Sequence, residues 1–191
     1  MLPSMTPPRG SGRRLSADDW IQAGFALLAD GGPNALRIDR LCERLNVTKG
    51  SFYWHFTDIA RYRADLVQAW GELRDDDRRH FGELAGLPPR ERLSEMMSAL
   101  VSTRHWTLER AMREWARTDE DAAASVRAAD QRVLAAVRQA FLDYGFDPDD
   151  ADLRAEATFA AGIGFLHLAG PQPSLRASAR REGLLEIMLK P

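Results

Sequence analysis

Apolar residues at helical spacing, interrupted by glycine and proline, run through this chain from Ser16 onward and constrain its fold more than any other feature. The first such segment begins at Ser16, a good N-cap residue, and stops at Gly31-Gly32-Pro33. No segment has the alternating pattern of a half-buried strand, and no internal repeat is present. We therefore expect an all-α fold of about nine helices.

Capping residues and helix breakers set the approximate bounds of these helices. Asp58, Asp119 and Asp147 are each suited to begin a long one, and Gly86-Leu87-Pro88-Pro89 separates two others. The expected helices are 16–31, 38–45, 48–56, 58–81, 90–104, 106–118, 119–144, 147–169 and 174–189.

Composition and targeting signals indicate an ordinary globular protein, with 45% apolar residues in 191. The longest nearly uninterrupted apolar run, 158–170, is shorter than the roughly 20 residues that a membrane helix needs. The first residues lack the apolar stretch of a secretory signal, so we expect a cytoplasmic protein. The single cysteine, Cys42, is best explained as a small buried side chain, and we expect neither a metal site nor a cofactor.

The charge is unevenly distributed, although the net charge is only −2. Residues 1–63 hold nine Lys or Arg against six Asp or Glu, whereas residues 64–191 hold 17 against 22. This distribution is typical of a protein in which only the N-terminal part touches nucleic acid. Residues 1–14, rich in Pro, Gly, Ser and Arg, are predicted to form a flexible basic arm.

Residues 38–56 predict two short helices joined by a tight turn. The apolar residues of 38–45 recur at i, i+3, i+4 and i+7, and Asn46 suits a left-handed helix end. Thr48 then caps the next helix, so only three or four residues separate the two. This is the spacing of a helix-turn-helix unit.

The second of these helices carries large rings on both faces. At about 100° per residue, Thr48, Phe52 and Phe56 share an inner face, whereas Gly50 and Trp54 lie opposite. A tryptophan alone is more often core than surface, but burying Trp54 would require burying both faces of a very short helix. We therefore predict that Trp54 points outward.

An outward Trp54 suits the major groove of DNA, which is about 12 Å wide and admits a helix. Lys49 and Trp54 are then the candidates for base contacts, and Tyr53 and His55 on the flanks are the candidates for phosphate contacts.

The segment from Leu15 to about Trp70 resembles the TetR family of transcriptional repressors. The stretch LCERLNVTKGSFYWHF, above all Tyr53 to Phe56, carries the resemblance. It implies a three-helix DNA-binding head and a larger helical domain that binds a ligand and dimerises through its last two long helices. We place the head at 15–62 and the larger domain at 63–191. The resemblance also implies that operator DNA faces the residues Thr48, Lys49, Gly50, Ser51, Tyr53, Trp54 and His55.

Two positions depart from the family pattern. Arg37 stands where members usually begin the second helix with a Thr or Ser that touches phosphate. Residues 57–60, Thr-Asp-Ile-Ala, stand where a Lys is common. We expect Arg37 to supply a longer phosphate contact, and Arg61 or Arg63 to replace the missing lysine.

The larger domain has no motif of its own, so its ligand pocket is inferred from composition. Apolar bulk with a few polar groups suits a small-molecule pocket, although ordinary core is the commoner explanation for any one of these residues. The candidates are Met97, Val101, His105, Trp106, Met112, Trp115, Phe159, Phe165 and His167. We expect the effector to be apolar or aromatic.

Small residues between positions 155 and 164 would let another helix approach closely. We predict that helices 148–169 and 174–189 form a two-fold four-helix interface between two copies of the chain.

The leading hypothesis is a ligand-responsive DNA-binding regulator, a repressor that binds a palindromic operator as a homodimer and is not an enzyme. One alternative is a small-molecule-binding protein or enzyme with a non-functional head, although no catalytic constellation supports it. Another is a head that contacts only protein.

Overall fold

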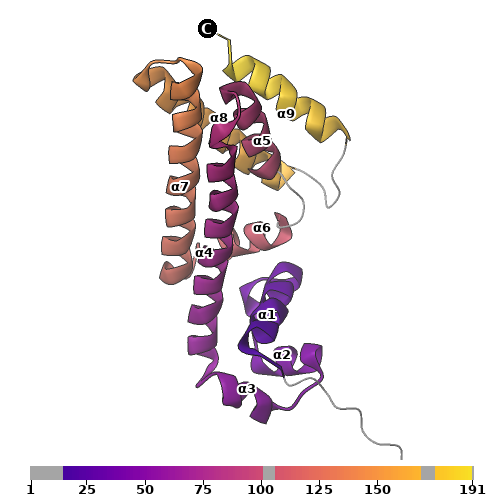
Figure 1. The fold of residues 1–191 in the computed structure, drawn as a ribbon. Coiled ribbons are helices and arrows are strands. Elements are labelled where there is room, and N and C mark those ends of the chain that lie inside the picture. Colours follow the sequence, from indigo (N-terminus) through magenta and orange to yellow (C-terminus); the bar gives the residue numbers. More distant parts are fainter. Residues whose placement is uncertain (1–14, 101–105, 169–174, 191) are drawn as a thin grey trace, which may run out of the picture.

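The computed structural model describes residues 15–100, 106–168 and 175–190, and within these ranges the chain is all helical, as the sequence predicts. Figure 1 shows α1 to α3 at one end of an elongated molecule, with α4 leading away from them beside α7. The nine described helices are α1 (Ala17–Gly31), α2 (Ile38–Leu45), α3 (Lys49–His55), α4 (Ile59–Glu83), α5 (Pro89–Leu100), α6 (Trp106–Trp115), α7 (Glu120–Tyr144), α8 (Pro148–Leu168) and α9 (Leu175–Met188).

Local sequence signals account for both ends of α1. The Ser16 hydroxyl accepts a hydrogen bond from the Asp19 N–H at 3.2 Å, and the Ser16 N–H donates to the Asp19 carboxylate at 2.7 Å. At the other end Gly32 has a φ of 68° and donates its N–H to the Leu28 carbonyl. The short 3-10 turn Pro33–Ala35 that follows was not predicted from the sequence.

The turn between α2 and α3 has the predicted form. Asn46 adopts a left-handed conformation with a φ of 54°, and its N–H points back to the carbonyls of Cys42 and Glu43. Thr48 occupies the N-cap position of α3, although its side chain makes no capping hydrogen bond. Three residues therefore separate the two helices, which confirms the helix-turn-helix spacing.

A cluster of rings fixes α3 and α4 against α1. Phe52 and Phe56 both pack edge-on against Trp20, with ring centroids 5.5 Å and 6.4 Å away. The buried hydroxyl of Tyr62 donates to the Trp20 carbonyl at 2.9 Å. A Cβ at Gly24 would lie 1.9 Å from this hydroxyl, so the glycine permits α4 to approach α1 this closely.

One hydrophobic core extends from the head into the rest of the molecule. It joins Trp20 of α1 to Leu66 and Trp70 of α4, and then to Met112 and Trp115 of α6. The helix α4 also runs unbroken across residues 62 and 63. The division of the chain at this point therefore stays a prediction.

A second hydrophobic core occupies the end of the molecule away from the head. It is built from α5, α7, α8 and α9, and includes Leu93, Phe141, Ala155 and Leu185. Among the described helices, none combines the length and the apolar content that crossing a lipid bilayer requires.

One expected helix end and one side chain are corrected by the structure, and another expected helix end lies outside the described residues. The helix expected over 90–104 is described only as far as Leu100, because residues 101–105 lie outside the described ranges. The helix α6 ends at Trp115 rather than 118, since both the N–H and the hydroxyl of Thr118 donate back to the Trp115 carbonyl. Thr48 is exposed rather than on the inner face, because its backbone at the N-cap is extended.

Candidate nucleic-acid interface

The short helix α3 divides its rings between the core and the surface as predicted. The Phe52 ring is fully buried, whereas Trp54, two residues later, is 69% exposed and Tyr53 is 57% exposed. A soluble protein gains free energy by burying such rings, so two of them side by side on an exposed helix indicate a surface that meets a partner.

The two rings on the flanks of α3, Tyr53 and His55, pack against the buried rings of the core. The Tyr53 ring packs edge-on against Phe52, with centroids 5.5 Å apart. His55 is half-buried, and its ring lies 6.2 Å from those of Trp20 and Phe56. Because one side of each ring rests on the core, the exposed edges of Tyr53 and His55 have fixed directions before any partner binds.

Packing within the protein does not explain the glycine at position 50. A Cβ there would meet only the Thr48 Oγ1, at an ordinary contact distance of 3.7 Å. Gly50 is also exposed, as are Thr48 and Lys49, and Ser51 is half-buried. The absent side chain leaves room for close approach from outside.

Arg37 lies at the start of α2 and is paired there. Its Nη2 lies 3.1 Å from the Asp39 carboxylate, and both side chains are exposed. Desolvation raises the pKa of Asp39, but hydrogen bonding to the Arg40 N–H and the charges of Arg37 and Lys49 outweigh it and lower the pKa overall. A carboxylate thus stands between two cations that are candidates for DNA contact.

Of the two arginines proposed to replace the family lysine, only Arg61 points outward. Arg61 is exposed and pairs with Asp65 at 2.9 Å, one turn along α4. Arg63 is half-buried and donates to the Leu36 carbonyl at 3.2 Å. Arg63 therefore ties α4 to the segment before α2, and its expected role as the replacement cation is wrong.

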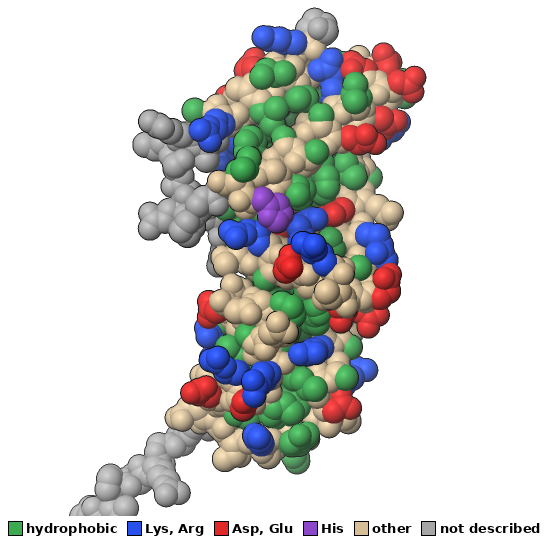
Figure 2. Space-filling view, turned by 180° about the vertical axis from the view of Figure 1, so that it is seen from behind, with side chains coloured by type: hydrophobic (Ala, Val, Ile, Leu, Met, Phe, Trp, Pro, Cys, Tyr) green, Lys and Arg blue, Asp and Glu red, His purple; other side chains and the backbone are tan. Residues whose placement is uncertain are grey.

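Charges of both signs are mixed over the body of the protein. Figure 2 shows one long face, on which Lys and Arg side chains alternate with Asp and Glu from one end to the other. A mixed face of this kind does not attract a polyanion along its whole length.

The candidate ligand residues do not form one group. Met112 and Trp115 are buried in the core that reaches the head, whereas Met97 is buried in the second core. Trp106 and Phe165 are half-buried and His167 is exposed. Val101 and His105 lie outside the described residues. Of the seven candidates that the structure describes, Met97 lines a hollow between α5 and α9, and Phe159 lines another between α4, α6, α7 and α8.

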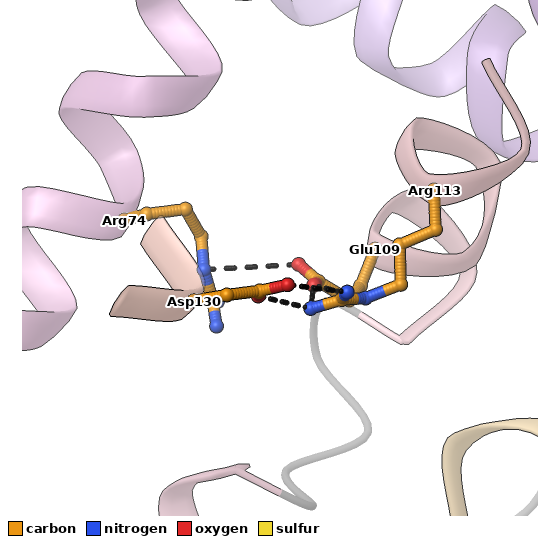
Figure 3. A network of polar contacts seen from close by, with 4 residues as sticks. All are labelled: Arg74, Glu109, Arg113 and Asp130. Carbon is orange, nitrogen blue, oxygen red and sulfur yellow. Dashed lines mark hydrogen bonds and ion pairs between the residues drawn. The ribbon is translucent and has the colours of Figure 1, made fainter. Parts of the chain in front are cut away.

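A network of charged side chains forms one wall of this hollow (Figure 3). Arg113 of α6 donates to both oxygens of Asp130 on α7, at 2.6 Å and 3.0 Å, and to Glu109 Oε1 at 2.9 Å. Arg74 of α4 lies 3.7 Å from the other Glu109 oxygen, Oε2. The remaining lining residues are Ala129, Val133, Phe159, Gly162, Ile163 and Leu166.

The network keeps Arg113 charged although it is largely buried. Burial lowers the pKa of Arg113, but the hydrogen bond to Asp130 and the charge of Glu109 outweigh this effect and raise the pKa overall. These charged residues were not predicted from the sequence. The only signal is the spacing of Glu109 and Arg113 by four residues, which more often marks an exposed pair.

No group of three or more metal-ligating side chains occurs among the residues that the structure describes.

Comparison with known proteins supports both the head and the whole fold. Residues 21–60 match the family model of the bacterial regulatory proteins of the tetR family. These residues include α2 and α3 and most of α1. No curated protein is significantly similar to the chain in sequence.

Solved structures with the same fold cover nearly the whole chain. A transcriptional regulator from Rhodococcus sp. has a TM-score of 0.74 at 21% identity, over 92% of this chain and 94% of its own. A TetR-like regulator from Rhodococcus sp. has a TM-score of 0.71 at 20% identity, over 93% and 94%. A ketosteroid transcriptional regulator of Mycobacterium tuberculosis has a TM-score of 0.64 at 18% identity, over 95% and 97%. At these identities the likeness concerns the fold.

Proposed function

We propose that this chain, whose residues 21–60 match the family model of the tetR bacterial regulatory proteins, is a DNA-binding transcriptional regulator. It is a repressor that binds a palindromic operator as a homodimer and responds to a small molecule. The exposed Trp54 carries this proposal, because a ring that is 69% exposed gains little from burial in its own chain and is available to a partner. The residues proposed to contact DNA are Arg37, Thr48, Lys49, Gly50, Ser51, Tyr53, Trp54, His55 and Arg61.

In this proposal α3 enters the major groove with Trp54 and Lys49 toward the bases. The indole packs on a thymine methyl and the lysine donates to guanine, each contact being worth about 1–3 kcal/mol of discrimination. Tyr53 and His55 lie against the phosphates on either side. Two heads on a dimer would read half-sites about 34 Å apart, one helical turn of DNA.

The proposed dimer uses α8 and α9. Large apolar side chains on these helices are exposed in the single chain, with Leu168 85% and Ile187 60% exposed. A Cβ added at Gly164 or Gly183 would meet no atom within 4 Å, which leaves room for an approaching helix. Exposed apolar groups of this size favour a covering partner, and a second copy of the chain supplies one.

The proposed ligand acts through α6. One side of α6 carries Leu108, Met112 and Trp115 into the core shared with α1 of the head. Another side carries Glu109 and Arg113 to the wall of the hollow. A molecule that binds the hollow more tightly in one position of α6 would therefore shift the head, and only this difference in affinity can drive the change.

Selection of bound duplexes from a random pool tests the proposal. We expect a palindromic site whose binding weakens steeply with salt and disappears in the double variant Tyr53→Phe, His55→Ala. A chain with a non-functional head would enrich no sequence. A head that contacts only protein would bind no duplex at low salt.

A further inference from the structure

We propose that the hollow beside Glu109 binds a largely apolar molecule through one neutral hydrogen-bond donor, such as a hydroxyl group. The inference deepens the proposed function and rests on its ligand-responsive part. Three features of the hollow support this proposal: a buried oxygen without a hydrogen-bond donor, a balanced set of charges, and a largely apolar lining.

The first feature is the second carboxylate oxygen of Glu109. Glu109 is only 8% exposed, and its Oε2 makes no hydrogen bond, although Oε1 accepts one from Arg113. Arg74 Nε lies 3.7 Å from this oxygen, which is an ion-pair distance rather than a hydrogen bond. A buried acceptor left in this state is costly, so the site favours any ligand that brings a donor to it.

The second feature is the charge of the wall. Two arginines, Arg74 and Arg113, face two carboxylates, Glu109 and Asp130, so the four groups sum to zero. An ammonium group at Oε2 would lie close to the Arg74 guanidinium, and a carboxylate would meet Glu109 itself. Like charges disfavour both, which leaves a neutral donor as the group that suits the oxygen.

The third feature is the shape and lining. The hollow holds about 430 Å³ of empty space, part of it open to solvent, and this volume is within the range of small-molecule sites. Phe159, Ile163 and Leu166 of α8 and Val133 of α7 line it, so the body of the ligand lies on apolar side chains.

Four naphthalene derivatives that differ in one group test this chemistry. Binding of naphthol, naphthalene, naphthoate and naphthylmethylammonium to the purified full chain is measured by titration calorimetry at neutral pH. We expect naphthol to bind with one site per chain, about tenfold or more tighter than each of the other three, because only naphthol brings a neutral donor.

Two variants locate the binding. Glu109→Gln lets the amide oxygen accept from Arg113 and turns the NH2 group toward the hollow, so naphthol should lose about tenfold in affinity. Gly162→Leu fills the hollow and leaves the charges intact, and it should abolish binding. Gly82→Leu is the matched control, since its Cβ also meets no atom within 4 Å but lies outside the hollow.

The proposal is overturned if naphthalene or naphthoate binds as tightly as naphthol, if none of the four binds, or if Gly162→Leu binds naphthol unchanged. Binding of the selected duplex is measured on the same samples. If the parent chain binds the duplex but not naphthol, the donor site alone is rejected. If the parent chain binds no duplex, the proposed function is rejected instead.

Discussion

At the scale of single residues, whether a ring of α3 is buried or exposed depends on its angle around a seven-residue helix. Phe52 and Trp54 are two positions apart, and one is fully buried while the other is 69% exposed. Because the helix is so short, one face suffices to anchor it on Trp20 and the opposite face is exposed to solvent. This division was predictable from the sequence, because the wheel angles of the two rings differ by about 200°.

The contact between α1 and α4 leads to a first prediction about stability. In Gly24→Ala the added methyl group meets the Tyr62 hydroxyl and Leu66, so the two helices must separate. We expect the free energy of unfolding in urea to fall by about 1–3 kcal/mol. Gly82→Ala, where nothing lies within 4 Å, should be neutral or slightly stabilising. Equal stability of the Gly24→Ala variant and the parent would contradict the packing described here.

The buried Tyr62 leads to a second prediction, for alkaline pH. Burial raises its pKa well above the ordinary value of 10.0, so the phenol of the unfolded chain loses its proton first. The contribution of the protonated Tyr62 to the free energy of unfolding is therefore fully present below pH 10.0 and decreases as the pH rises above that value. Because Tyr62→Phe removes the hydrogen bond to the Trp20 carbonyl, its free energy of unfolding should be about 1 kcal/mol lower at neutral pH. The stability of this variant should also fall less steeply at alkaline pH than that of the parent.

Urea unfolding of the parent and of Tyr62→Phe on both sides of this pH provides the measurement, with the exposed Tyr53→Phe as control. If the stability of parent and variant fell in parallel above pH 10.0, the burial of the Tyr62 hydroxyl would not be the cause.

At the scale of secondary-structure elements, α6 has the central position. It contacts α1 of the head, α7 and α8, and its charged residues form part of the wall of the hollow. Its polar network spans three helices, because Arg74 comes from α4 and Asp130 from α7. The network thus fixes the position of α6 between the hollow and the head.

Removing the central cation of this network should destabilise the folded protein. Arg113→Met leaves Glu109 and Asp130 largely buried without their main partner, and we expect a loss of about 2–4 kcal/mol, since the pair retains some exposure. Arg117→Met is the matched control, because its pair with Glu114 is exposed on both sides and should contribute less than about 1 kcal/mol. Chemical unfolding of both variants compares the two losses. Similar losses would show that the network does not hold α6.

The elements themselves were largely predictable, and the hollow was not. Capping residues such as Ser16 and helix ends such as Asn46 and Gly145 act locally, so the sequence reveals them. Which side of α6 faces the head and which faces the hollow depends on the helices that pack against it. Met112 and Trp115 therefore entered the predicted pocket, although they pack toward the head. Arg74 and Asp130 lie far apart in sequence, and no local pattern indicates that they belong to one network.

At the scale of the whole molecule, the exposed side chains of α8 and α9 bear on assembly. We expect sedimentation at micromolar concentration to give twice the 21.4 kDa of one chain. Ile187→Glu, which places a charge on an exposed apolar position of α9, should shift the protein toward monomer. Leu87→Glu, between the α4 and α5 segments, should leave the mass unchanged. A monomeric parent would remove the proposed interface.

The central claim is that Trp54 faces DNA, and the affinity of the parent and of Trp54→Ala for the selected duplex tests it most directly. Anisotropy titrations should show a loss of about 1–3 kcal/mol for Trp54→Ala on that duplex, with the weak, salt-sensitive binding of random duplex retained. Tyr144→Ala, an exposed ring far from the head, should bind like the parent. If Trp54→Ala binds the selected duplex as tightly as the parent does, the claim is contradicted.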